Sequence, residues 1–167
     1  MTAAERAAPI EGVRIVPLRR FDDERGWFLE ARRESWFAEL GGKPSRQTNV
    51  VWSRRSVIRG LHYHELGQDD LFFCPVGEVR VVLYDRREDS PTHGVAWSHD
   101  IGAANLEAVY IPGRVAHGYE ALTDCLFLYH VTHEYNPADE RGFAWNDPRV
   151  RHLWSTSEPI LSARDQV

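Results

Sequence analysis

The fold is decided by residues 59–85, RGLHYHELGQDDLFFCPVGEVRVVLYD. This stretch falls into three short runs, 57–64, 71–76 and 78–85, that are rich in β-branched and aromatic residues. Runs of this length and composition are typical of β-strands. Turn signals separate them at Leu66-Gly67-Gln68 and Val76-Gly77-Glu78, where glycine permits tight turns. The stretch therefore predicts three consecutive short strands.

The same pattern continues on both sides of this stretch. Further strands are predicted over 13–18, 47–53, 94–100, 107–111, 116–121 and 126–134. The segment DDERG at 22–26 is a turn signal, and residues 35–40 predict a short helix that ends at Gly41-Gly42. Many short strands at regular spacing indicate an all-β sandwich or jelly roll.

Length and composition fit a single domain over 1–167. The chain has 167 residues, without a linker or a low-complexity tract, which suits one sizeable core. Residues 1–9 are Ala-rich with mixed charges and are interpreted as a disordered tail. From Asn146 onward the sequence is irregular or briefly helical, and Trp145 and Trp154 are expected to anchor this part on the strands.

Charge and hydropathy exclude several classes of protein. The formal net charge of -5 argues against a nonspecific nucleic-acid binder, which needs a basic surface. No apolar run approaches the roughly 20 residues of a membrane span, and the N-terminus lacks the apolar stretch of a secretory signal. We therefore expect a cytoplasmic protein, with Cys74 and Cys125 as buried free thiols.

Three histidines and one carboxylate approximate the spacing of the metal motifs of cupins. His62 and His64 are two residues apart, so in a strand their side chains lie on the same side. Asp70 follows six residues later, and His117 lies in IPGRVAHGYE. Such a set suits iron, manganese, zinc or nickel. The spacing leaves two interpretations open, a metal site inside a barrel or histidines that only satisfy polar neighbours.

Other polar residues do not indicate a function when each is taken alone. Tyr129 shares a strand face with Phe127 and Val131, and a hydroxyl inside a barrel could act as a general acid. Its alternative role is to line the wall. Taken alone, the following residues are ordinary surface residues: Asp165, Arg25, Arg59 and Gln47.

Several longer segments together resemble a known family. They are FDDERGWFLE, QTNVVWSRRSVIRGLHYH, VGEVRVVLYDRREDSPTHG, IPGRVAHGY, FLYHVTHEYNPADERGFAWNDP and PILSARD, within a match from Val13 to Asp165. With them the chain resembles the dTDP-4-dehydrorhamnose 3,5-epimerases. The resemblance implies a homodimeric double-stranded β-helix, a cupin-type jelly roll with short peripheral helices. It also implies a nucleotide-linked 4-keto-6-deoxyhexose as substrate, in deoxysugar biosynthesis, and no metal or organic cofactor.

The resemblance further implies a mechanism and its residues. The carbon next to the ketone loses a proton and regains one on the opposite face, which inverts C3, C5 or both. The family's base matches His62, its carboxylate partner matches Asp165, and the acid on the other face matches Tyr129. Positions that contact the sugar nucleotide match Arg25, Glu30, Gln47, Asn49 and Arg59, with His117 as a further active-site histidine and Tyr135 at the nucleotide-side mouth.

The chain departs from the family at Asp70, where the family has a lysine that is placed to stabilise the enolate oxygen. A carboxylate there opposes developing negative charge. His64 also stands where glutamine is usual. Because His62, Tyr129 and Asp165 are kept, we expect an epimerase with an altered substrate or a single inverted centre, in which Asp70 contacts the substrate.

Two other functions stay open. A metal-dependent cupin enzyme would use His62, His64, Asp70 and His117 as ligands, since the departures at two of these positions complete a cupin metal set. A non-catalytic sugar-nucleotide binding protein would bind without proton exchange. For the homodimer, we expect the strand near residues 13–18 to join the partner's sheet and cover a bare strand edge.

Overall fold

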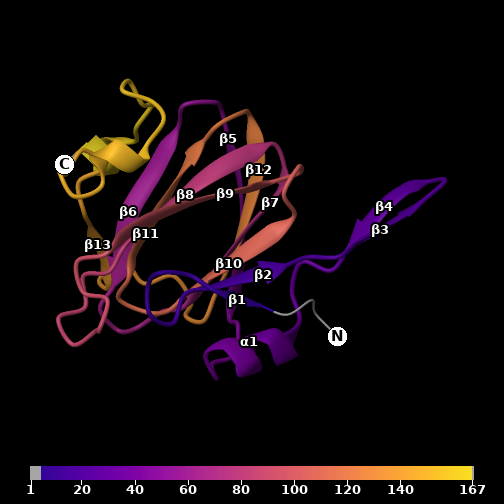
Figure 1. Cartoon of the computed structure of the whole chain (residues 1–167), viewed down its shortest axis with the longest axis horizontal. Helices are drawn as coiled ribbons and strands as arrows, with labels where there is room; N and C mark the ends of the chain where they lie inside the picture. Colours follow the sequence, from indigo (N-terminus) through magenta and orange to yellow (C-terminus); the bar gives the residue numbers. More distant parts are fainter. Residues whose placement is uncertain (1–4, 167) are drawn as a thin grey trace.

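Residues 5–166, which the computed structural model describes, form two antiparallel sheets wrapped around a common core (Figure 1). The larger sheet has the order β1 (Arg6–Ala7), β2 (Arg14–Pro17), β10 (Glu107–Ile111), β7 (Asp70–Val76), β12 (Cys125–Val131) and β5 (Gln47–Ser53). The smaller has the order β13 (Glu140–Gly142), β6 (Ile58–His64), β11 (Ala116–Ala121), β8 (Glu78–Tyr84) and β9 (Ala96–Gly102). This is the double-stranded β-helix that the sequence predicts.

Side chains that point inward from both sheets build the core. Along β8, Val79, Val81 and Leu83 alternate with outward-facing residues, as the two-residue repeat of a strand requires, and all three are fully buried. From the facing sheet Phe72 and Phe127 meet them in one cluster. Cys74 and Cys125 lie in the same cluster as buried free thiols, as expected.

Each sheet is also covered on its outer face. Helix α1 (Glu34–Leu40) packs Trp36 and Phe37 against Leu71 and Phe73 of the larger sheet. The C-terminal segment covers the smaller sheet, where Trp154 is buried and its indole N–H donates to the carbonyl oxygen of Trp145 at 2.8 Å. This segment contains two short 3-10 helices, η1 (Arg151–Leu153) and η2 (Ala163–Gln166). The predicted anchoring by the two tryptophans is confirmed.

The N-terminal region differs from the sequence predictions. Residues 1–4 of the predicted disordered tail lie outside the described residues, but Arg6–Ala7 form β1 and pair with β2. Strand β2 also pairs with β10 of the same chain, and β1 covers its other edge at Arg14 and Ile15 only. The pairing of residues 13–18 with a partner's sheet stays a prediction, with Val16 and Pro17 as the part of this edge that β1 leaves open.

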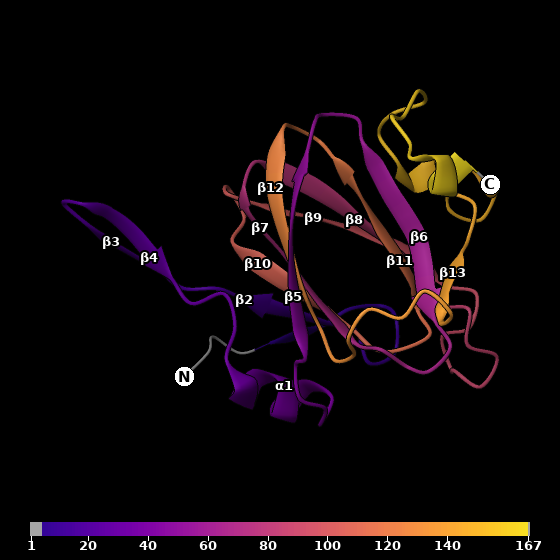
Figure 2. The ribbon, with the colours of Figure 1, turned by 180° about the vertical axis from the view of Figure 1, so that it is seen from behind.

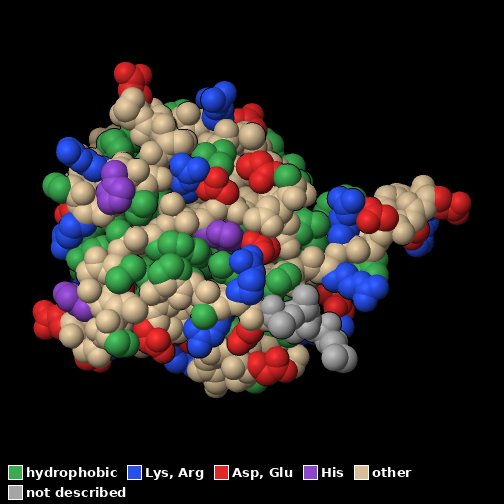
Figure 3. All heavy atoms as spheres, viewed as in Figure 1, with side chains coloured by type: hydrophobic (Ala, Val, Ile, Leu, Met, Phe, Trp, Pro, Cys, Tyr) green, Lys and Arg blue, Asp and Glu red, His purple; other side chains and the backbone are tan. Residues whose placement is uncertain are grey.

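A hairpin of β3 (Arg20–Asp23) and β4 (Gly26–Leu29) projects from the barrel (Figures 1 and 2). The predicted turn at 22–26 lies at its tip, but its two strands and β13 were not predicted. In the space-filling view the hairpin stands clear of the body of the molecule (Figure 3). Within residues 5–166, no helix has the length and apolar character that crossing a membrane requires.

Candidate active site

A cavity of about 440 Å³ opens into the barrel between the two sheets. Strands β5, β6, β7, β11 and β12 supply its walls, and the C-terminal segment closes one side. Of the site residues predicted from the sequence, it brings together Gln47, Asn49, Arg59, His62, Asp70, His117, Tyr129, Tyr135 and Asp165. His64, which the sequence offered as a metal ligand, lines it as well.

Two glycines set the spacing of the strands that carry the histidines. Strands β6 and β11 pair with His117 opposite His62, and their register shifts between His117 and Tyr119. A Cβ atom at Gly118 would lie 2.5 Å from the carbonyl oxygen of Arg59, and Gly60 has a φ of 122° that side chains disfavour. The two strands thus approach closely because neither position carries a side chain.

His62 is paired with a carboxylate from the far end of the chain. Its Nε2 lies 2.8 Å from Oδ1 of Asp165, and the hydroxyl of Ser162 donates to Oδ2 of the same carboxylate at 2.8 Å. Burial opposes the ionisation of Asp165, but these hydrogen bonds outweigh it and hold its pKa below the ordinary value. An ionised Asp165 fixes the orientation of the imidazole, as the third group of a catalytic triad does.

Two charged residues that the sequence did not indicate complete this wall. Arg164 donates to both carboxylate oxygens of Glu140, at 2.6 and 2.7 Å. The guanidinium Nη2 of Arg164 lies 2.9 Å from Nε2 of His62 and 3.3 Å from its Nδ1, and Glu140 lies 3.7 Å from Nδ1. Arg164 stands beside Asp165 in the quoted LSARD motif, but no local pattern marks Glu140.

Tyr129 faces the cavity from the opposite wall. It lies on β12 of the larger sheet, between Asn49 of β5 and Phe72 of β7, whereas His62 lies on the smaller sheet. Burial, followed by the negative charges of Asp70 and Glu140, raises the pKa of Tyr129 above its ordinary value. Its phenol is therefore held protonated, which suits a proton donor.

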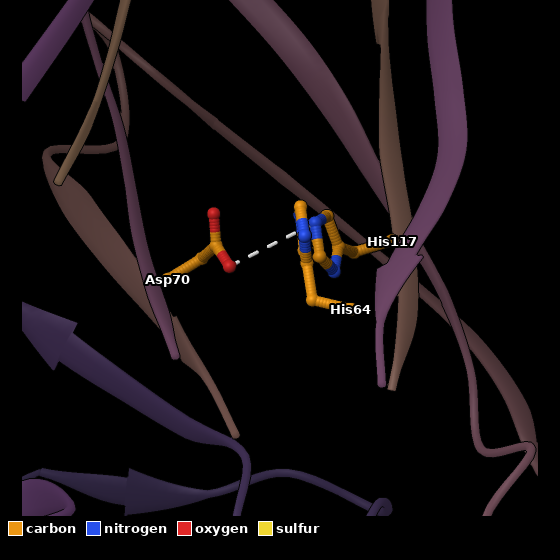
Figure 4. Close-up of side chains that lie close together, drawn as sticks. All are labelled: His64, Asp70 and His117. Atoms are coloured by element: carbon orange, nitrogen blue, oxygen red, sulfur yellow. Dashed lines mark ion pairs between the residues drawn. The ribbon is translucent and has the colours of Figure 1, made fainter. Parts of the chain in front are cut away.

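His64, Asp70 and His117 form a buried cluster that bridges the two sheets (Figure 4). One possible ligand atom from each residue lies within 4.8 Å of the others. Burial raises the pKa of Asp70 to about 7 and lowers that of His117 to about 4. Burial, and then His117, also lower the pKa of His64. Two histidines and one carboxylate are suitable ligands for a divalent transition metal.

The remaining polar residues line the route toward the mouth. The side-chain amide of Gln47 donates to Asn49 at 2.8 Å and its oxygen accepts the backbone N–H of Tyr135 at 2.9 Å. Arg59 donates to the hydroxyl of Ser53 at 3.1 Å. A guanidinium suits the oxygens of a diphosphate because it can donate two parallel hydrogen bonds.

Arg25 and Glu30 do not line this cavity of their own chain, so their contact with the sugar nucleotide stays a prediction. Arg25 is at the tip of the projecting hairpin, where its side chain is 84% exposed and pairs with Asp23. Glu30 follows β4 and accepts hydrogen bonds from Arg33. The hairpin carries Arg25 away from the barrel of its own chain, and Glu30 lies directly after the hairpin, outside the lining of the cavity.

Comparisons with known proteins agree on one family. The family model described as dTDP-4-dehydrorhamnose 3,5-epimerase matches residues 7–167. The enzyme of that name from Salmonella typhimurium is 38% identical over 162 residues, which cover 93% of this chain and 88% of that protein. The crystal structure of NovW, a 4-keto-6-deoxy sugar epimerase from the novobiocin biosynthetic gene cluster of Streptomyces spheroides, has a TM-score of 0.89 at 34% identity. That match covers 99% of this chain and 85% of the other. ChmJ, a 3'-monoepimerase from Streptomyces bikiniensis in complex with dTDP-quinovose, has a TM-score of 0.86 at 32% identity, with 94% and 82% covered.

Proposed function

Because this chain belongs to the dTDP-4-dehydrorhamnose 3,5-epimerase family, it is a sugar-nucleotide epimerase of deoxysugar biosynthesis, and we propose that its active site is the cavity between the two sheets. Its substrate is a dTDP-linked 4-keto-6-deoxyhexose, inverted at C3, C5 or both. The relatives are epimerases, so neither a metal-dependent enzyme that uses His62 as a ligand nor a non-catalytic binding protein is favoured.

His62 is the base in this proposal. It removes the proton from the carbon next to the ketone, and the ionised Asp165 holds the ring in place and stabilises the imidazolium that forms. Tyr129 returns a proton to the other face of the same carbon. The observation that carries the proposal is the placement of the His62–Asp165 pair and Tyr129 on opposite walls of one cavity.

The remaining cavity residues bind the substrate. We assign Arg59 to the diphosphate because its guanidinium is positioned by Ser53 and lines the cavity. Asp70 and His117 lie deeper, beside the sugar. Three residues of the outer cavity, Gln47, Asn49 and Tyr135, are assigned to the nucleotide side.

We also propose a homodimer in which the hairpin of one chain reaches the cavity of the other. This would bring Arg25 and Glu30 to a substrate, which their own chain does not do. The exposed Phe21, Trp27 and Phe28 of the hairpin support the idea, since their side chains are 43 to 63% exposed in the single chain. The two buried free thiols are compatible with a location in the cytoplasm.

The direct test is incubation of the protein with dTDP-4-keto-6-deoxyglucose in heavy water. Mass spectrometry and NMR then report deuterium at C3 and at C5. Uptake at either carbon, together with an inverted product, supports the epimerase and identifies the centre. An unchanged sugar without deuterium, recovered from protein that binds it, would contradict the proposal and favour a binding role.

A further inference from the structure

The cluster of His64, Asp70 and His117 has the geometry of an open metal site. Each residue comes from a different strand, β6, β7 and β11, and all three line the cavity. Ligand atoms about 2.1 Å from a tetrahedral zinc ion stand roughly 3.4 Å apart. Nε2 of His117 and Oδ2 of Asp70 are 3.8 Å apart, and the three ligand atoms all lie within 4.8 Å of one another. They would therefore have to close by at most about 1.4 Å to bind a cation.

A backbone carbonyl behind His117 orients its ring as the outer partners of metal-binding histidines do, and a buried carboxylate stands within reach of His64. Nδ1 of His117 lies 2.9 Å from the carbonyl oxygen of Val115, so its N–H donates there and Nε2 presents a lone pair to the cavity. Nδ1 of His64 lies 3.7 Å from Oδ2 of the buried Asp139. The other oxygen of Asp139 accepts the backbone N–H of Leu66 at 2.9 Å.

The carboxylate of Asp70 has fewer and longer hydrogen bonds than that of its neighbour Asp69. Asp69 pairs with Lys43 at 2.8 Å and also accepts hydrogen bonds from Tyr110 and Gly113. Among residues 5–166, the hydrogen bonds to the Asp70 carboxylate come from the Gln68 amide alone, at 3.3 and 3.4 Å. The Asp70 side chain is only 3% exposed. A buried carboxylate stays ionised only with a compensating charge, and a cation between Asp70 and the two histidines would supply it.

We propose that His64, Asp70 and His117 bind one divalent first-row transition cation, which takes the ketone oxygen of the substrate as a further ligand. The second part rests on the proposed function. His62 is not a ligand, because it is paired with Asp165. As His62 takes the proton from carbon, the cation stabilises the negative charge on the ketone oxygen, and that charge returns to carbon as Tyr129 delivers its proton. The step exchanges protons only and needs no oxidant or reductant.

The binding site is tested without substrate. Protein stripped with a chelator is titrated with Co²⁺, followed by visible absorption, and with Zn²⁺, followed by calorimetry. We expect one equivalent to bind, with affinity reduced at least about 100-fold in Asp70→Asn and in His64→Gln, and about 10- to 100-fold in Asp139→Asn. His152→Gln, an exposed histidine outside the cavity, is the matched control. Thermal unfolding identifies any variant that fails to fold. If either Asp70→Asn or His64→Gln fails to fold, the other still tests the site.

The role of the cation is tested by deuterium exchange in stripped and reloaded protein. We expect exchange at the carbon next to the ketone to fall at least about 100-fold on stripping and to return with Co²⁺ or Zn²⁺. Weak binding that is not stoichiometric, or that the ligand variants leave unchanged, overturns the site. Exchange that is the same in stripped protein overturns the role but leaves the epimerase intact. Stoichiometric, variant-sensitive binding without any exchange supports the site and contradicts the proposed function.

Discussion

At the scale of single residues, the chemistry depends on how Asp165 holds His62. The two residues are 103 positions apart in the chain, and their side chains meet at 2.8 Å. We expect His62→Ala to reduce deuterium exchange at least about 100-fold, since the base is lost. Asp165→Asn should also reduce it strongly, because an amide cannot stabilise the imidazolium. Exchange by His62→Ala at the wild-type rate, with folding confirmed by circular dichroism, would remove His62 as the base.

Asp70 allows a second test at this scale. Lysine at this position removes the carboxylate ligand but places an ammonium group beside the ketone oxygen. We expect exchange by Asp70→Lys to become insensitive to chelator and to lie within about 10-fold of the metal-loaded wild type, because a fixed charge replaces the cation. Asp70→Asn, which has neither charge, is the matched control and should be slow with or without metal. A slow, chelator-insensitive Asp70→Lys would argue against an electrophile at this position.

Some of these residues could be placed from the sequence and others could not. His62 and His64 were correctly predicted to face one cavity, because the two-residue repeat of a strand is a local property. Glu140 could not be found, since its contact with Arg164 joins β13 to the C-terminal segment and depends on the tertiary structure. Arg25 and Glu30 matched the family pattern, but a match in sequence does not say which chain's cavity a residue serves.

At the scale of elements, the loop between β8 and β9 is built around one buried carboxylate. Asp85 accepts hydrogen bonds from the Arg87 guanidinium, at 2.8 Å to each oxygen, and from the hydroxyls of Ser90 and Thr92. This assigns a structural role to the SPTHG motif. Burial opposes ionisation of Asp85, but these donors outweigh it and hold its pKa well below the ordinary value.

Removing this carboxylate should destabilise the protein in a pH-dependent way. We expect Asp85→Ala to lower the free energy of unfolding by about 3 kcal/mol at pH 7, because Arg87 loses its buried partner. Since the folded pKa of Asp85 is depressed, its contribution is complete above the ordinary carboxyl pKa. Below about pH 4 it falls by roughly 1 kcal/mol per pH unit. Urea unfolding from pH 7 to pH 3 should therefore show the difference between variant and wild type shrinking. A difference that is constant with pH would mean that packing, not charge, explains the loss.

The elements of the barrel were predictable and the hairpin was not, for a physical reason. Strands β5, β10 and β11 begin and end at the predicted residues, because alternation between two environments and turn glycines mark them in the sequence. In the single chain, every residue of β3 and most of β4 are exposed. Such strands lack the alternation that burial imposes, so only their turn signal was recognised.

At the scale of the whole molecule, a hairpin that stands alone requires an explanation. Isolated two-stranded hairpins are marginally stable in water, and this one exposes three aromatic side chains. A second apolar area lies on β5, whose outer face exposes Val50 and Trp52 by 62 and 57%. Exposed apolar surfaces of this kind are typical of interfaces. The proposed two-fold dimer would cover both apolar areas, because it repeats one contact twice.

The final prediction tests whether each cavity is completed by the other chain. Arg25→Ala keeps its own His62 but lacks a functional hairpin, and His62→Ala has the reverse defect. In a dimer that exchanges hairpins, a mixed dimer of these two inactive variants contains one intact site. Trp27→Ser with Phe28→Ser should give a monomer by light scattering, whereas the control Val76→Ser, at another exposed apolar side chain, should stay dimeric.

After the two inactive variants are unfolded together and refolded in equal amounts, deuterium exchange should recover to roughly a quarter of the wild-type rate, since half the dimers are mixed and each has one working site of two. If each chain's hairpin instead folded back over its own cavity, the mixture would show no recovery, because every cavity would lack either its arginine or its base.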